Sequence, residues 1–144
     1  MKSGVIVFIA GIICLGATGC ASLNSVQKAE LEAMKASDAN VYVEEKSTGT
    51  ATALGFLPGC GSFYTRQAGL GVLDLLLWPV SICWDPSAGY QGAKAINYSV
   101  SKARAKKMME QEMRELDEKL DEKLITDQQY RRDTKRITDR YKFD

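Results

Sequence analysis

The chain contains no histidine, and this absence excludes much catalytic chemistry. A general base or catalytic triad that uses imidazole cannot be built, and neither can a metal site with histidine ligands. The 18 acidic residues lie mostly in charged stretches rather than around a recognisable catalytic motif. Basic residues number 19, so the chain also lacks the strong positive field that selects nucleic acid. We therefore expect no enzyme, no metal and no nucleic-acid partner.

The start of the chain has the pattern of a secretory signal. After one lysine, the apolar stretch from Val5 to Leu15 is too short to span a bilayer, and small residues follow it up to Cys20. This arrangement resembles the bacterial lipobox, in which signal removal leaves a lipid-modified cysteine as the first residue of the mature protein. The resemblance implies a diacylglycerol and a fatty-acyl chain such as palmitate on Cys20, and no other cofactor. Ordinary secretory cleavage near Ala21 is the alternative.

The residue after Cys20 predicts a location. Ala21 stands where an aspartate would retain a lipoprotein in the inner membrane of enteric bacteria. The resemblance therefore implies an outer-membrane lipoprotein of the cell envelope that faces the periplasm. Loss of Lys2 with the signal would lower the 19 basic residues to 18, which equals the number of acidic residues.

Two further cysteines, Cys60 and Cys83, would remain in an oxidising compartment. A disulfide between them would close a loop of about 24 residues and contribute roughly 3 kcal/mol in the chain-entropy model. If residues 68–83 formed one straight helix, Cys60 could reach Cys83 only if 60–67 ran back along that helix. The candidate disulfide and two unbridged thiols both stay open.

Composition divides the chain into a signal peptide (1–19), a polar segment (20–50), an apolar segment rich in glycine and aromatic residues (51–92) and a charged segment (93–144). In the polar segment, apolar residues at helical spacing from Leu23 to Met34 predict a helix that Ser22 or Ser25 caps. Alternation around Val41 favours a short strand or an extended linker, and 46–50 should form a loop.

The apolar segment consists of two stretches joined by 65–67. Pro58 lies in the first and Pro79 in the second, and each should end or kink a helix just before it. Spacings of four and three place a small or polar set on one helical face: Gln67, Gly71, Asp74, Trp78 and Ser81. Asp74 is either a solvated or arginine-paired carboxylate, or an intramembrane polar site for a proton or an ion, and Arg66 is its nearest candidate partner.

The run from Leu57 to Tyr64, with Gly69-Leu-Gly71, Leu75 to Pro79 and Trp84-Asp85, resembles the two-pass transmembrane hairpin domain. The resemblance implies a membrane-associated helical hairpin without enzymatic activity. Its Gly-x-Gly pairs would serve as close-packing or turn residues rather than as a dinucleotide fingerprint. Ser62 stands where the family usually has histidine or arginine, and the second helix is short. We expect a half-buried hairpin, although a span or a soluble core stays open.

In the charged segment, apolar residues spaced by three and four predict a helix from about Ala93: Ile96, Val100, Ala103, Met109, Met113, Leu116, Leu120 and Leu124. A basic cluster follows the apolar segment: Lys102, Arg104, Lys106 and Lys107. Such a cluster either contacts anionic lipid headgroups, at about 1 kcal/mol per charge, or forms a solvated helix face.

A second helix should begin after Thr126, because Thr126-Asp-Gln-Gln129 matches a capping box. Tyr130, Thr134, Ile137 and Tyr141 form its apolar stripe, so two antiparallel helices are expected, packed as in a coiled coil. This tail resembles the short C-terminal domain (SHOCT) through Leu116, Leu120, Leu124, Ile125, Thr126, Tyr130 and Lys135. The family's usual turn glycine is missing, and Lys123 or Leu124 stands near its place. The resemblance implies oligomerisation or partner contact.

These patterns predict a mainly α protein, a lipid-anchored chain with a short Gly/Trp-rich membrane-associated helical hairpin and a charged C-terminal helical hairpin. The expected function is that of a non-enzymatic, membrane-anchored structural or interaction protein. It would self-associate or dock an envelope protein through its C-terminal helices. The alternative is a small permeabilising or ion-conducting oligomer that uses the apolar hairpin and Asp74.

Overall fold

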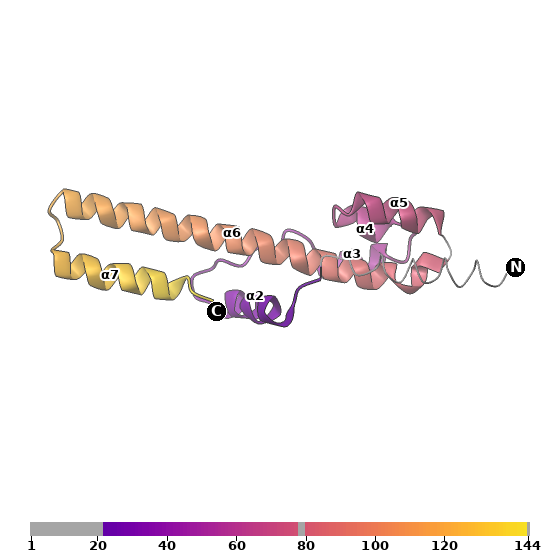
Figure 1. The fold of residues 1–144 in the computed structure, drawn as a ribbon, viewed down its shortest axis with the longest axis horizontal. Helices are drawn as coiled ribbons and strands as arrows, with labels where there is room; N and C mark the ends of the chain where they lie inside the picture. Colours follow the sequence, from indigo (N-terminus) through magenta and orange to yellow (C-terminus); the bar gives the residue numbers. More distant parts are fainter. Residues whose placement is uncertain (1–21, 78–79, 144) are drawn as a thin grey trace, which may run out of the picture. The chain divides into compact units, whose positions relative to one another are not determined.

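The structure, a computed structural model, describes residues 22–77 and 80–143, and this part of the chain is mainly helical, as predicted. It contains α2 (Ser25–Ala36), α3 (Thr48–Leu54), α4 (Cys60–Tyr64), α5 (Ala68–Leu76), the 3₁₀ turn η2 (Val80–Cys83), α6 (Asp85–Asp121) and α7 (Asp127–Arg140), and no strand (Figure 1). The predicted signal segment, the predicted lipid site Cys20, and Trp78 and Pro79 lie outside the described residues.

The described residues form two compact units. Unit 1 contains Ser22 and Thr48–Ala93, and unit 2 contains Leu23–Ser47 together with Lys94 and the residues after it. Helix α6 passes from unit 1 into unit 2 after Ala93. The predicted apolar segment, 51–92, lies in unit 1, whereas most of the predicted polar segment folds with the charged segment in unit 2.

Helix α2 begins with a capping box, and its cap is not one of the two serines that were predicted. Asn24, not Ser22 or Ser25, is the N-cap: its Oδ1 accepts from the Gln27 N–H at 2.8 Å. Gln27 Oε1 in turn accepts from the Asn24 N–H at 3.0 Å. Asparagine caps as well as serine does, and only Asn24 has a glutamine three residues later.

The core of unit 2 is small, and side chains of α6 bond to the backbone of the chain between α2 and α3. Its buried residues are Leu23, Leu31, Met34, Val41, Tyr98 and Ala105. The Lys46 N–H donates to Asn97 Oδ1 at 2.8 Å, and Asn97 Nδ2 donates to the Lys46 carbonyl at 2.8 Å. The Val43 N–H donates to Ser101 Oγ at 2.9 Å. The chain around Val41 therefore forms the extended linker rather than the short strand. Its backbone bonds to side chains of α6 and not to another strand.

Two helix starts differ from the prediction. Helix α3 begins at Thr48, inside the predicted loop 46–50. Helix α6 begins at Asp85 rather than near Ala93, and Pro86 lies in its first turn, where a missing N–H costs no hydrogen bond. The predicted apolar stripe of α6 is right at Leu116, which is buried, and wrong at Ala103, which is exposed.

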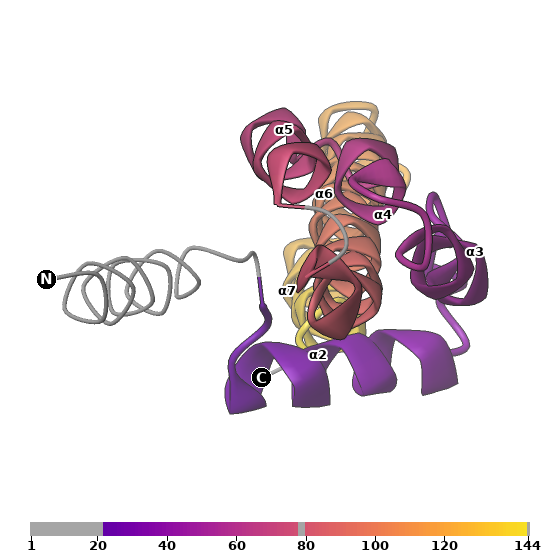
Figure 2. The same ribbon diagram turned by 90° about the vertical axis from the view of Figure 1, so that its right-hand side faces the viewer.

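Helix α7 lies antiparallel to the later part of α6 within unit 2 (Figure 1). Tyr130 Oη donates to Asp117 at 2.8 Å, and Arg140 donates to both carboxylate oxygens of Glu112, at 3.1 and 3.0 Å. The predicted Thr126 capping box is confirmed. Helix α2 instead runs across α6, as comparison of Figures 1 and 2 shows.

Candidate functional site

Among the side chains of unit 1 whose burial the structure describes, those in the interior are small or polar. The buried apolar ones are alanines, and the buried polar ones are Ser62, Thr65, Asp74, Ser81 and Asp85. Seven large apolar side chains of this unit are instead at least 42% exposed: Phe56, Leu57, Phe63, Val72, Leu73, Leu75 and Leu76. This is the reverse of the usual burial preference of a water-soluble domain. We call these seven residues the exposed apolar set.

Helix α5 shows the inversion most clearly. It buries Gly71 and Asp74 and exposes Val72, Leu73 and Leu76. The predicted small or polar face is therefore confirmed at Gly71 and Asp74, which pack inward rather than facing water. Gln67 precedes the helix and is half-buried, and Ser81 lies in η2. An apolar outer face combined with a small inner face is typical of helices that pack in lipid.

Glycines allow the helices of unit 1 to approach closely. Helix α4 lies between α3 and α5 (Figure 2). A Cβ on Gly55 would collide with the backbone of Pro86, and one on Gly89 would collide with the Ala51 carbonyl. Gly59 adopts the left-handed conformation, with φ of 73°, at the start of α4, and a Cβ there would collide with the Gly71 carbonyl. The close-packing role predicted for the Gly-x-Gly pairs holds for Gly59, Gly61 and Gly71, whereas Gly69 faces open space.

Two buried carboxylates meet at the centre of unit 1. Asp74 comes from α5 and Asp85 from the first turn of α6, and Ser62 of α4 lies between them. Ser62 Oγ lies 2.8 Å from Asp74 Oδ2 and 3.0 Å from Asp85 Oδ1. Trp84 Nε1 donates to Asp74 Oδ1 at 2.8 Å, and the Gly59 N–H donates to Asp85 Oδ2 at 3.0 Å. We call Asp74, Ser62 and Asp85 the carboxylate cluster.

The cluster requires a proton beyond that of the hydroxyl. A serine hydroxyl donates only one hydrogen bond, so it cannot donate to two ionised carboxylates at once. One carboxyl must therefore donate to Ser62. Burial raises the pKa of Asp85 above its usual 3.8, and the nearby charge of Asp74 raises it further, although the hydrogen bonds from Ser62 and Gly59 lower it. This direction favours the protonated form of Asp85, which can donate a hydrogen bond to Ser62.

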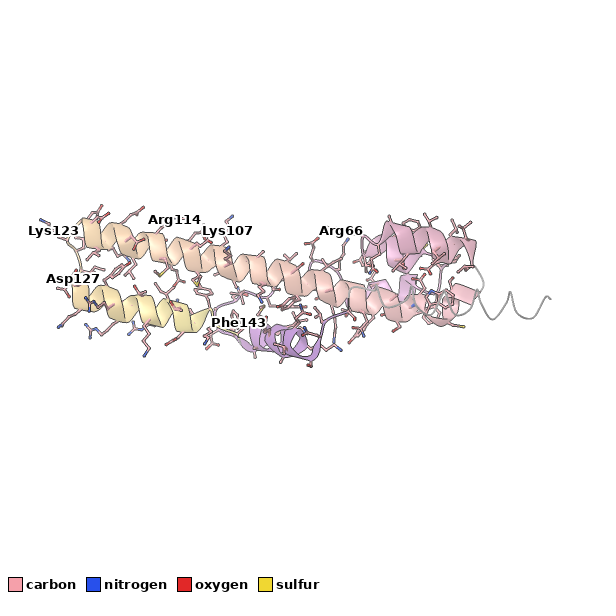
Figure 3. The ribbon with its side chains drawn as sticks, in the orientation of Figure 1. Arg66, Lys107, Arg114, Lys123, Asp127 and Phe143 are labelled. Atoms are coloured by element: carbon pink, nitrogen blue, oxygen red, sulfur yellow. The ribbon has the colours of Figure 1, made fainter. Side chains whose placement is uncertain are left out.

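This geometry corrects the interpretation of Asp74. Its side chain is 1% exposed and is held by Ser62 and Trp84, so it is not a solvated carboxylate. Arg66, which was expected as its partner, is exposed and has a positive φ of 63° (Figure 3). The sequence could have pointed to Ser62 as a site residue only through its position, where the two-pass hairpin family that the chain resembles usually has histidine or arginine.

The candidate disulfide is not formed. Cys60, in α4, is half-buried, Cys83, in η2, is exposed, and both are free thiols. Residues 68–83 do not form one straight helix, because α5 ends at Leu76, shortly before Pro79. Across residues 22–77 and 80–143, no group of three or more cysteine, aspartate or glutamate residues could hold a metal ion.

The predicted basic cluster does not form one surface. Lys102 Nζ donates to Glu30 at 3.0 Å and to Tyr98 Oη at 2.8 Å. Both hydrogen bonds raise the pKa of Lys102, and the one to Tyr98 has the larger effect. Lys106 lies 3.8 Å from Glu110. Lys107 projects from the edge of α6 that faces away from α7 (Figure 3). Arg104 is exposed as well.

No protein-family model, curated protein or solved structure matches the chain. The resemblances to the lipobox, to the two-pass hairpin and to the short C-terminal domain therefore stay predictions. In the part of the chain that the structure describes, no helix combines the length and the apolar character needed to cross a membrane.

Proposed function

We propose that this chain is a lipid-anchored protein of the bacterial cell envelope that acts by binding rather than by catalysis. In this proposal, unit 1 lies against the bilayer through its exposed apolar set. The observation that carries it is the inversion of unit 1, whose large apolar side chains are exposed while its carboxylates are buried. Exposed apolar surface of this kind marks a membrane or protein contact.

The lipid on Cys20 and the exposed apolar set would act together. The acyl chains expected on Cys20 are more than one, so they would anchor the chain by themselves. Fully burying one leucine or phenylalanine side chain contributes roughly 1.5–3 kcal/mol, so the exposed apolar set would in addition hold unit 1 against the bilayer. Phe56 and Leu57 precede α4, and Leu75 and Leu76 end α5, so the contact would involve both helices.

Unit 2 would then carry the interaction role. Its α6 and α7 present charged faces, with ion pairs between Lys106 and Glu110 and between Arg140 and Glu112. We propose that these helices, as a charged helical hairpin, self-associate or dock another envelope protein in the periplasm. In-cell crosslinking of the full chain should give a defined complex. Crosslinks that disperse over many proteins would contradict this role.

The lipid anchor is tested by an intact mass spectrum of the membrane-extracted protein. The expected mass is that of residues 20–144 plus acyl chains. A mass that lacks lipid, or that still includes 1–19, would remove the anchor from the proposal.

The contact of unit 1 with the membrane has to be tested on a chain without the lipid, so that only unit 1 can attach the protein. Residues 20–144 with Cys20→Ser keep every residue that the structure describes, and they can be tested for flotation with vesicles of phosphatidylethanolamine and phosphatidylglycerol. Leu76→Glu should weaken vesicle binding by about ten-fold, because a 75% exposed leucine of α5 becomes charged. Leu124→Glu is the matched control, since Leu124 is 68% exposed but belongs to unit 2. Equal binding by the two variants would refute the contact.

The alternative, an ion-conducting oligomer that uses Asp74, has less support from the geometry. Both carboxylate oxygens of Asp74 are engaged inside unit 1, by Ser62 and by Trp84. An ion path would require Asp74 to leave these partners. Dye leakage from vesicles that Asp74→Asn abolishes would favour this alternative over the proposal.

A further inference from the structure

Unit 2 contains a groove of about 680 Å³ between α2, α6 and the residues that follow α7. Its walls include Met34 of α2, Ala103 and Met109 of α6, and Tyr141 and Phe143 near the end of the chain. Figure 3 shows Phe143 between the end of α7 and α2. The volume falls in the range of small-molecule sites, roughly 300–1,000 Å³. Methionine side chains adapt their shape readily, which suits a flexible apolar ligand.

The charged residues that line this groove are mostly basic. Lys102 and Lys106 come from α6, and Lys142 follows α7, whereas Glu30 is the one acidic residue among those recorded along the groove. Glu30 is already paired with Lys102 at 3.0 Å. Lysine stems can extend along apolar surface while the ammonium groups stay in water. Lys106 also lies 3.8 Å from Glu110, whose side chain is outside the lining. The lining itself therefore combines an apolar wall with an excess of basic over acidic residues.

We propose that this groove binds a single-chain anionic lipid, with the acyl chain against Met109, Tyr141 and Phe143 and the anionic head beside Lys106 and Lys142. An anionic head complements the excess of lysine, and a single chain fits a site of this volume. The residues that line this groove belong to unit 2 and the exposed apolar set belongs to unit 1, so the inference does not depend on the proposed membrane contact of unit 1.

The test is calorimetric titration of the chain 20–144 with Cys20→Ser. The probe is dodecanoate, kept below the concentration at which it aggregates. One dodecanoate should bind per chain, and each methylene added to the probe should tighten binding by about four-fold. The cation dodecyltrimethylammonium has the same chain length and should bind about ten-fold more weakly, because its charge meets lysines.

Neighbouring lysines supply a matched pair of variants. Lys106→Glu reverses a charge at the groove, whereas Lys107→Glu makes the same change one residue later, outside the groove lining and on the edge of α6 away from α7 (Figure 3). We expect Lys106→Glu to weaken dodecanoate binding by about ten-fold and Lys107→Glu to leave it within about two-fold. Ala103→Trp should also abolish binding by filling the groove, and the fold should tolerate it because Ala103 is exposed.

Adsorption of the probe on unit 1 is distinguishable from binding in the groove. All three substitutions lie in unit 2, so they would leave adsorption on unit 1 unchanged. Equal affinity for Lys106→Glu and Lys107→Glu, or wild-type binding by Ala103→Trp, would overturn the proposal. Binding of the cationic probe as tight as that of dodecanoate would overturn it too.

Discussion

Asp74 and Asp85 share a single hydroxyl group, because Ser62 Oγ lies 2.8 Å from one carboxylate and 3.0 Å from the other. Hydrogen-bond donors come from Trp84 on the Asp74 side and from Gly59 on the Asp85 side. A proton on Asp85 would satisfy all four contacts, because Asp85 would then donate to Ser62 and Ser62 would donate to Asp74. The cluster thus joins α4, α5 and α6 in a unit whose interior has few large apolar contacts.

Replacing Ser62 with alanine should destabilise unit 1 by about 1–3 kcal/mol, because it removes the buried hydroxyl that Asp74 Oδ2 and Asp85 Oδ1 share. Urea unfolding followed by tryptophan emission measures this loss, since Trp84 belongs to unit 1 and is bonded to the cluster. Ser87→Ala is the control, because Ser87 is exposed in the same unit. If the two variants unfolded at the same urea concentration, the hydroxyl of Ser62 would not stabilise unit 1.

Lys123→Gly should stabilise unit 2 by about 0.5–1 kcal/mol, although it removes a side chain. Helix α6 ends in a Schellman motif: the Leu124 N–H bonds to the Lys119 carbonyl, and the Lys123 N–H bonds to the Leu120 carbonyl. Lys123 has a φ of 58°, the left-handed conformation that glycine adopts without strain. Lys107→Gly, inside α6, should instead destabilise by about 1 kcal/mol. Thermal unfolding followed by circular dichroism measures the melting temperature of both variants. Shifts of the same sign would contradict the claim that Lys123 is strained.

Features specified by neighbouring residues could be predicted from the sequence. The Thr126 capping box and the stripe that includes Ile137 depend on residues three and four positions apart, and the structure has both. The inward face of α5 follows from the same spacing and holds at Gly71 and Asp74. The start of α6 was missed because Pro86 was taken as a boundary, although proline is tolerated in a first turn.

Features that depend on distant pairs could not be predicted. Asn97 and Ser101 are buried because they bond the backbone at Lys46 and Val43, which lie 51 and 58 positions earlier. Ser62 gains its role from Asp74 and Asp85, which lie 12 and 23 positions later. Periodicity along one helix carries no information about such partners.

Protein alkylated without reduction should carry two labels, on Cys60 and Cys83, because both thiols are free. Cys83 is exposed and Cys60 is half-buried, so Cys83 should react first. Peptide mass spectrometry over a time course measures the order. A mass increase of two hydrogens on reduction, with no labels before it, would show a disulfide that this structure lacks.

The stability of unit 1 should fall as the pH rises through the raised pKa of Asp85. The folded state holds the Asp85 proton more tightly than the unfolded state, whose pKa lies near 3.8. The stabilising contribution is therefore complete below pH 3.8 and is lost as the pH climbs through the folded-state value. The facing charge is that of Asp74, which strengthens the effect.

Asp85→Asn isolates this contribution from every other titrating group. The introduced asparagine mimics the protonated form of Asp85, since its Oδ1 can accept from the Gly59 N–H while its Nδ2 donates to Ser62. Urea unfolding of both proteins between about pH 4 and pH 8 should show the variant gaining stability relative to wild type as the pH rises. Asp127→Asn, at an exposed position in unit 2, should track wild type throughout. A difference between Asp85→Asn and wild type that stays constant with pH would mean that Asp85 does not hold the shared proton.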